Sequence, residues 1–284
     1  MKKTILLSLL SFLIFCSCKK KSIIENELDS LEISAKNFNS VDTTFYKNKK
    51  IKSLRFYKVK TEYVDVFFYE SGKKKSIGQA KNNQCHNKYI DWYENGKQKW
   101  VRQYNLGNQI GKSIMYRENG NFEKQFDNDK NEMTDYWENG KPKFKFIENK
   151  LQYYYYLNGN LFEKYDKIKE DEYNVKYFNE NGKLVLSGLY KKNILYKDSR
   201  KYTGKIICYF NNGKISDFEE FINGSPTGRC YGYYGNGNIK YDNEFENGKA
   251  ILSKYYYESG KINSIRDKKN KTYRVWDENG KLTK

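Results

Sequence analysis

The chain has 284 residues, a formal net charge of +18 and 17% aromatic residues, with a mean hydropathy of −0.98. So low a hydropathy argues against one compact aliphatic core. The aromatic content excludes an intrinsically disordered chain, because disordered chains are poor in aromatic residues. We therefore expect an extended sheet whose surface is covered with aromatic rings.

The strongly basic balance has two explanations. It favours anionic partners such as nucleic acid, anionic lipid or an acidic protein. The other explanation is compositional, because Lys, Asn, Ile, Tyr and Phe are enriched together and the lysines are spread along the whole chain. The charge alone therefore selects no partner.

Residues 1–17 resemble a bacterial lipoprotein signal peptide. Two lysines precede an apolar stretch from Thr4 to Phe15, which is too short to span a membrane but suits a signal peptide. The small Ser17 precedes Cys18, so we expect cleavage before Cys18 and lipidation of its thiol. The alternative is an ordinary secretory signal with incidental cysteines.

A lipidated Cys18 would carry several acyl chains, which hold a protein on a membrane far better than one chain does. Three lysines at 19–21 favour a periplasm-facing location on the outer membrane. The sequence thus predicts an exported, lipid-anchored protein of the bacterial envelope. Residues 18–44 are polar and are predicted to be a tether.

A turn motif, aromatic-x-Asn-Gly-Lys in its clearest form, recurs along the rest of the chain. Its glycines are Gly72, Gly96, Gly120, Gly140, Gly159, Gly182, Gly213, Gly237, Gly260 and Gly280. Most steps between them are near 23 residues, a period that indicates tandem repeats packed on their neighbours. The longest step, from Gly182 to Gly213, suggests a first array at 45–190 and a second at 191–284.

Each repeat is predicted to be a hairpin followed by a return turn. Asn95-Gly96 is typical of a two-residue type I′ turn, in which both central residues have positive φ. In that geometry Glu94 faces Lys97 across the strands and the pair fixes the register. The fold class is therefore all-β: an elongated single-layer antiparallel β-meander of about ten tandem hairpin repeats.

Aromatic doublets precede many of the turns. Neighbouring strand residues point to opposite faces, so each doublet places a ring on both sides of the sheet. These rings are the candidate binding surface. The candidates are Trp92, Tyr93, Tyr136, Trp137, Tyr155, Tyr156, Tyr233, Tyr234, Tyr256 and Tyr257.

The Tyr-x-Asn-Gly-Lys turns at this period resemble the variant MORN repeats, over about residues 45–284. The resemblance is to the bacterial YwqK-like group, often labelled as antitoxin components. It implies a repeat fold and, from related arrays, membrane contact or scaffolding. An exported immunity-type role would reconcile the antitoxin label with the signal peptide.

No catalytic or metal motif stands out. Cys85 and His86 are neighbours, whose side chains point apart in a strand, and together they are too few for a zinc site. Cys208 and Cys230 fall in matching strands of successive repeats, too far apart for a disulfide, and are expected to be free buried thiols. We predict no enzyme activity and no cofactor.

Acidic clusters at 170–172 and 219–220 could suggest acid–base chemistry. They are scattered along the array and no pattern marks a pocket around them. We expect their side chains to be solvated.

The leading hypothesis is a non-catalytic, lipid-anchored binding or scaffold protein that presents an aromatic and basic sheet to a protein or membrane partner. One alternative is an antitoxin or immunity-type protein that neutralises a partner toxin. Another is an envelope glycan-binding module, because aromatic plates stack sugar rings. Single-stranded nucleic acid would also stack on such rings, but the predicted export of the protein argues against nucleic acid as a partner.

Overall fold

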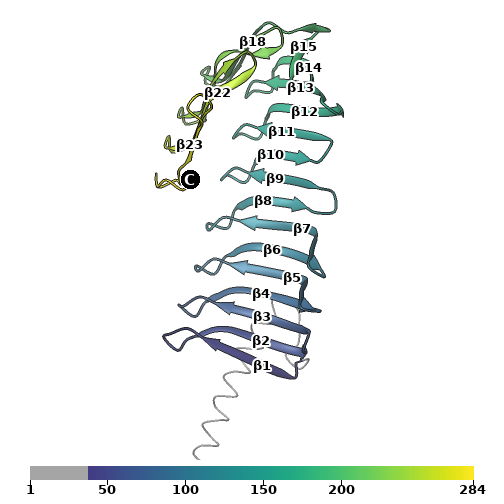
Figure 1. Ribbon diagram of the computed structural model, residues 1–284, viewed down its shortest axis with the longest axis vertical. Helices are drawn as coiled ribbons and strands as arrows, with labels where there is room; N and C mark the ends of the chain where they lie inside the picture. Colours follow the sequence, from purple (N-terminus) through teal and green to yellow (C-terminus); the bar gives the residue numbers. More distant parts are fainter. Residues whose placement is uncertain (1–37) are drawn as a thin grey trace, which may run out of the picture. The chain divides into compact units, whose positions relative to one another are not determined.

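The computed structural model describes residues 38–284, which contain 24 β-strands and no helix (Figure 1). The strands pair antiparallel, nearly always with the next strand in sequence. The predicted all-β meander of hairpin repeats is therefore confirmed. The predicted signal peptide, Cys18 and most of the tether lie outside the described residues. No helix in the described part of the chain is long and apolar enough to cross a membrane.

The described residues divide into two compact units, one ending at Asp129 and one beginning at Lys130. The first contains β1 (Ser40–Phe45), β2 (Ile51–Val59), β3 (Glu62–Phe68), β4 (Lys74–Lys81), β5 (Gln84–Trp92), β6 (Gln98–Asn105), β7 (Asn108–Tyr116) and β8 (Phe122–Asp127). β1 begins before residue 45, where the array was predicted to start.

The core of the first unit lies on one face of its sheet. Alternate residues of β2 and β3 are buried there, as the two-residue period of a strand requires. The buried set is Leu54, Phe56, Val64, Val66, Phe68, Ile77 and Ile90. Despite the low overall hydropathy, this sheet therefore has a short apolar stripe of aliphatic and phenylalanine side chains.

The second unit contains two sheets. The strands of the first, 16-stranded sheet that belong to this unit are β9 (Glu132–Tyr136), β10 (Pro142–Ile147), β11 (Leu151–Tyr155), β12 (Leu161–Lys169), β13 (Glu172–Phe178), β14 (Leu184–Lys191), β15 (Ile194–Lys197) and β16 (Arg200–Lys201). The second consists of β17 (Gly204–Tyr209), β18 (Ile215–Ile222), β19 (Ser225–Pro226), β20 (Gly228–Tyr233), β21 (Ile239–Glu246), β22 (Lys249–Tyr256), β23 (Ile262–Asp267) and β24 (Thr272–Val275).

These two sheets share a buried core. β13, β14 and β15 contribute to it from the first sheet, and β17 and β18 from the second. Its members are Val175, Tyr177, Leu186, Leu195, Ile206, Cys208 and Phe221. The second unit thus adds a second layer to the hairpin array at this place, which the repeat pattern did not predict.

The predicted type I′ geometry of the Asn-Gly-Lys turns is wrong. Gly96 N–H donates to Tyr93 O at 2.9 Å, and Tyr93 N–H donates to Lys97 O at 2.8 Å. The loop is therefore three residues long, with only its last residue, Gly96, at positive φ (+89°). This is a type I turn closed by a glycine bulge.

The longer loop also removes the predicted cross-strand pair of Glu94 and Lys97. Glu94 lies within the loop, and Tyr93 is the residue opposite Lys97. Two-residue turns with both residues at positive φ do occur, but at the return turns. Asn223 and Gly224 have φ of 49° and 79°.

Candidate functional site

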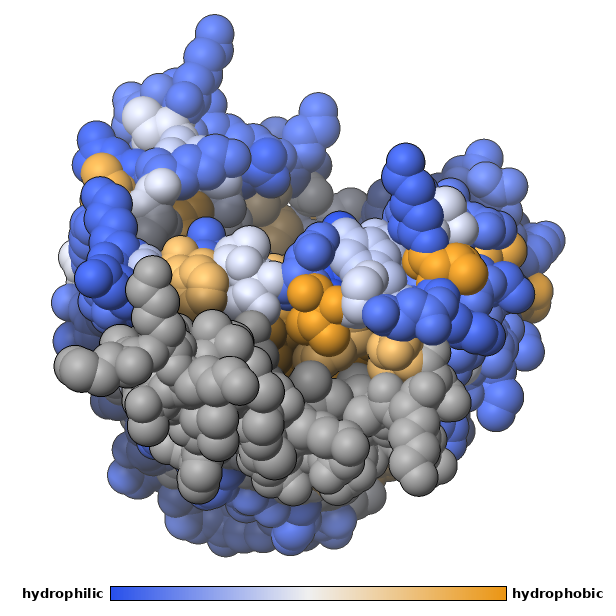
Figure 2. All heavy atoms as spheres, turned by 90° about the horizontal axis from the view of Figure 1, so that it is seen from below, coloured by the Kyte–Doolittle hydropathy of each residue, from blue (hydrophilic) through white to orange (hydrophobic). Residues whose placement is uncertain are grey.

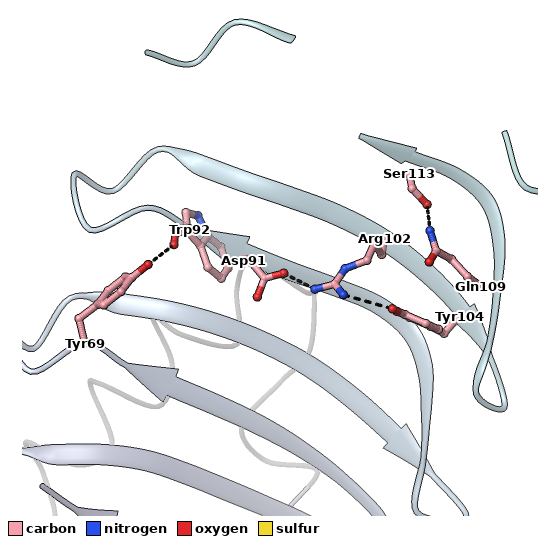
Figure 3. A network of polar contacts seen from close by, with 7 residues as sticks. All are labelled: Tyr69, Asp91, Trp92, Arg102, Tyr104, Gln109 and Ser113. Carbon is pink, nitrogen blue, oxygen red and sulfur yellow. Dashed lines mark hydrogen bonds and ion pairs between the residues drawn. The ribbon is translucent and has the colours of Figure 1, made fainter. Parts of the chain in front are cut away.

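At six of the turns a tyrosine stands immediately before the loop, and its hydroxyl connects one repeat to the next. The Tyr93 hydroxyl donates to Tyr116 O at 2.8 Å, and the Tyr69 hydroxyl donates to Trp92 O at 2.7 Å (Figure 3). Comparable bonds are made by Tyr46, Tyr156, Tyr234 and Tyr257. Four predicted binding aromatics (Tyr93, Tyr156, Tyr234 and Tyr257) therefore have hydroxyls engaged in packing. The sequence signal was the recurrence of tyrosine at this place after 23 or 24 residues, from Tyr46 to Tyr69 to Tyr93 and from Tyr234 to Tyr257.

The asparagine of the turn has two structural roles. Asn95 Oδ1 accepts from Lys97 N–H at 2.9 Å, which shapes its own turn. Its amide Nδ2 donates to Glu118 O at 2.9 Å in the next repeat. Lys97 Nζ also donates onward, to Asn119 O at 2.6 Å. The Asn-Gly-Lys motif is thus explained by repeat packing.

Lysine ammonium groups lie over aromatic rings near the turns. Lys74 Nζ is 4.8 Å from the Trp92 ring centroid, and Lys143 Nζ is 4.7 Å from that of Trp137. Lys99 lies 5.4 Å from Tyr93. Burial lowers the pKa of Lys74. These cation–π contacts place positive charge directly on the predicted aromatic surface.

The polar network of the first unit centres on Arg102 (Figure 3). Its guanidinium forms an ion pair with Asp91 and donates to the Tyr104 hydroxyl at 3.3 Å. It also lies 4.1 Å from the Trp100 ring. Burial raises the pKa of Asp91, an effect that the charge of Arg102 opposes. The ion pair joins β5 to β6 and so helps to fix the sheet, while Arg102 Nε and Trp100 Nε1 are buried without a hydrogen-bond partner among the described residues.

An aromatic pocket lies in the second unit, where its two sheets face each other. Five predicted binding residues line it: Trp137, Tyr155, Tyr156, Tyr233 and Tyr234. Its other lining residues are Leu157, Phe162, Phe210, Ser216, Asp217, Gly235, Lys240 and Glu258. The cavity has a volume of about 40 Å³.

The remaining candidates lie elsewhere. Trp92 and Tyr93 belong to the first unit, Tyr136 ends β9, and Tyr256 ends β22. Tyr257 donates to Trp276 O at 2.8 Å. The sequence therefore identified the aromatic residues but not which of them converge.

The floor of the aromatic pocket is polar. Ser216 Oγ and the Tyr156 hydroxyl share a hydrogen bond of 3.0 Å. Asp217 is buried, with 3% of its surface exposed, and accepts a short hydrogen bond from the Tyr241 hydroxyl. Burial raises the pKa of Asp217 to about 7. A carboxyl group that titrates near neutrality is typical of functional sites, although structural networks produce it too.

Asp217 belongs to a larger group of buried carboxyls and tyrosines between the sheets. The Tyr165 hydroxyl donates to Glu163 Oε1 at 2.5 Å and lies 3.4 Å from the Tyr177 hydroxyl. Tyr177 in turn donates to Glu219 Oε2 at 3.5 Å. Burial raises the pKa of both glutamates. We call Glu163, Asp217, Glu219, Tyr165, Tyr177 and Tyr241 the carboxyl–tyrosine cluster.

The cluster corrects one prediction about the acidic residues. Glu219 is half-buried and hydrogen-bonded rather than solvated. Its place on the inner face of β18 depends on the second sheet packing over the first, which sequence periodicity could not reveal. Glu170 and Asp171, by contrast, are exposed as predicted. Glu172 is half-buried and forms an ion pair with Lys191 at 3.1 Å, and Glu220 is half-buried, so the prediction is wrong for these two residues as well.

The cysteines of the described residues are free thiols. Cys208 and Cys230 are buried, and burial raises the pKa of both thiols, that of Cys230 to about 11. Both thiols therefore stay protonated and unreactive at neutral pH. Cys85 is exposed, and His86 Nδ1 accepts a long hydrogen bond, 3.4 Å, from Leu106 N–H. Within residues 38–284, no group of His, Cys, Asp and Glu side chains is arranged to hold a metal ion.

No protein-family profile and no curated protein matches the chain. The TarM G117R mutant of S. aureus, in complex with fondaparinux, alpha-GlcNAc-glycerol and UDP, is similar at a TM-score of 0.25 and 15% identity, over 39% of this chain and 24% of that one. TcdB2-TccC3 without its hypervariable C-terminal region gives a TM-score of 0.18 and 12% identity, over 85% and 16%.

Alternansucrase in complex with isomaltononaose gives a TM-score of 0.16 and 18% identity, over 77% of this chain and 17% of that one. The chain spans about a quarter or less of the length of these structures. Scores this low carry no argument about function.

Proposed function

We propose that this chain is a non-catalytic, lipid-anchored binding protein of a bacterial envelope, which presents repeated aromatic and basic side chains to a protein partner. The observation that carries the proposal is the recurrence of lysine–aromatic pairs next to successive turns. Lys75 lies over Tyr69, Lys99 over Tyr93 and Lys143 over Trp137, with the lysine six residues after the aromatic each time.

Such pairs suit protein recognition. A ring held by hydrogen bonds and packing loses little conformational entropy on binding, and aromatic residues are enriched in the cores of interfaces. The lysine above the ring adds a charge that attracts acidic groups. Much of the face drawn in Figure 2 is hydrophilic, with apolar residues in small groups, as expected for a surface that meets water when unbound.

The binding mode would be multivalent. Each lysine–aromatic pair offers one shallow contact, and the repeat places further pairs along the sheet. Several weak contacts on one rigid scaffold bind far more tightly than any of them alone. The lipid on Cys18 would confine the protein to the membrane surface and raise its effective concentration there.

The first test is a pull-down from envelope extracts with the native lipidated protein and with Cys18→Ala. A triple variant, Lys75→Gln, Lys99→Gln and Lys143→Gln, removes charges that lie over rings. Its matched control replaces Lys60, Lys81 and Lys249, which are exposed at return turns. We expect one protein to be retained by the native and Cys18→Ala forms, and to be lost only with the first triple variant.

Retention of lipid alone, abolished by Cys18→Ala, would contradict the proposal and indicate a membrane-surface role. Equal loss with both triple variants would show that net charge, not the lysine–aromatic pairs, drives binding.

A further inference from the structure

We propose that the aromatic pocket of the second unit binds a saccharide residue of a glycan, with a hydroxymethyl group of the sugar next to Asp217. The site is separate from the lysine–aromatic pairs of the proposed function and does not depend on them. It is built from the residues of the two facing sheets within one compact unit.

The shape of the pocket sets the size of what enters it. A cavity of about 40 Å³ holds a few water molecules or one hydroxymethyl group. The body of a larger ligand must then lie at the mouth, against aromatic side chains. Trp137 and Tyr155 come from the first sheet, and Tyr233 and Tyr234 from the second. Pyranose rings have apolar C–H faces that pack on aromatic rings, while their hydroxyls require polar partners.

Two polar groups beside the pocket can supply such partners, and one of them has none of its own. Trp137 Nε1 is buried and has no hydrogen-bond acceptor within residues 38–284. Asp217 lines the same pocket and accepts from the Tyr241 hydroxyl through Oδ1. Buried donors are nearly always paired in folded proteins, so the unpaired N–H of Trp137 beside this cavity calls for a ligand or water, and the carboxyl of Asp217 is an acceptor in the same lining.

The pair of groups also selects the chemistry of the ligand. A hydroxyl both donates and accepts, so sugar hydroxyls satisfy an N–H donor and a carboxyl acceptor together. An anionic ligand would meet the carboxyl of Asp217, and a cationic one would meet the ammonium of Lys240, which also lines the pocket. A neutral polyhydroxylated ligand avoids both repulsions.

Lys240 gives the site a further donor. Its Nζ lies 5.8 Å from the Phe162 ring centroid, so the ammonium is held against the aromatic wall. Glu258, also part of the lining, is exposed and belongs to the rim. The pocket thus combines an aromatic wall, a buried acid and flanking donors, which is the usual composition of a small-molecule site.

The test is a titration of the full-length lipidated protein in detergent micelles with maltotetraose, cellotetraose and the β-linked tetramer of N-acetylglucosamine. Tryptophan fluorescence and saturation-transfer NMR report binding. We expect saturable binding of at least one tetramer at about millimolar concentration, as suits a shallow, solvent-accessible site.

Two conservative variants locate the binding. Asp217→Asn keeps an acceptor for Tyr241, and Trp137→Phe keeps an aromatic ring but removes the N–H donor. Each should weaken binding about tenfold, because a polar partner of a sugar hydroxyl is lost or altered. Trp92→Phe, in the first unit, is the matched control and should bind like the wild type. Circular dichroism checks that every variant is folded.

Absence of saturable binding of all three tetramers up to about 10 mM would overturn the proposal. Wild-type affinity in folded Asp217→Asn and Trp137→Phe would also overturn it, since the sugar would then bind elsewhere. Neither result affects the pull-down of a protein partner, so failure of the saccharide site and failure of the proposed function are distinguishable.

Discussion

The carboxyl–tyrosine cluster predicts that the second unit loses stability as the pH rises toward neutrality. Burial raises the pKa of Asp217 from an ordinary value of 3.8 to about 7 in the folded protein. Between these two pH values the unfolded chain has released the proton while the folded protein still holds it. The folded state therefore binds more protons than the unfolded state, and its stability falls with increasing pH.

The magnitude follows from the size of the shift. A difference of about three pKa units at 1.36 kcal/mol per unit is about 4 kcal/mol, which is an upper bound because the site can relax or admit water. The charged and titratable neighbours of Asp217 are Glu163 on β12, Cys208 on β17, Glu219 on β18, and Lys240 and Tyr241 on β21. The charge of Glu163 also raises the pKa of Asp217, whereas the hydrogen bond from Tyr241 and the charge of Lys240 lower it.

The assay is urea unfolding at pH 5, 6, 7 and 8, followed by hydrogen exchange of peptides that cover β18. Asp217→Asn cannot titrate and should remove part of the loss, leaving the part that belongs to Glu163 and Glu219. Asp166→Asn is the control. Burial alone would raise the pKa of Asp166, but hydrogen bonds from Lys164 and Tyr153 lower it overall. Asp166 therefore contributes stability that is lost only as the pH falls, and its replacement should leave the slope above pH 5 unchanged.

A wild-type stability that stays constant or rises from pH 5 to pH 8 would refute this reasoning. So would a slope that is the same in wild type and Asp217→Asn, because Asp217 would then not be the titrating group.

Three further predictions concern single residues. Gly96→Val should open one hairpin. Gly96 has φ +89° and no atom lies within 4 Å of an added Cβ, so the strain comes from the backbone conformation and not from a steric clash. Amide hydrogen exchange should increase in that hairpin alone, and unchanged exchange would contradict the loop geometry. Tyr93→Phe should lower the free energy of unfolding by about 0.5–1.5 kcal/mol, because it removes the hydrogen bond to Tyr116 O. Tyr255→Phe is the control and should cost less, because Tyr255 is 47% exposed. Equal losses would show that the hydrogen bond between repeats contributes nothing. Gly232→Ala should destabilise the second unit, because the added Cβ would lie 2.6 Å from the Tyr241 ring. A variant that melts at the wild-type temperature would refute this close packing.

The repeat architecture could be predicted because its signal is local. Turn glycines, strand alternation and aromatic doublets each depend on residues near in sequence. The turn type was mispredicted for the same reason, since Asn-Gly occurs in two-residue and three-residue loops alike. Only the bond from Gly96 N–H to Tyr93 O distinguishes them.

The carboxyl–tyrosine cluster could not be predicted, because it depends on which face of β18 is covered. Asp217 and Glu219 alternate with Phe218 along the strand, so the pattern fits acids facing water equally well. Burial of the acidic face follows from the packing of the second sheet on β13 to β15. That contact joins residues far apart in sequence, and no repeat period encodes it.

The same packing explains why a pocket forms in the second unit. One row of hairpins presents side chains outward, and its tyrosine hydroxyls are used by the next repeat. Two facing sheets bring turn-proximal rings from both sides together, so that Trp137 and Tyr234 line one cavity. Facing sheets also bury carboxyls that a single layer would leave in water. The aromatic repeat thus supplies the wall of the pocket, and the departure from a single layer supplies its polar floor.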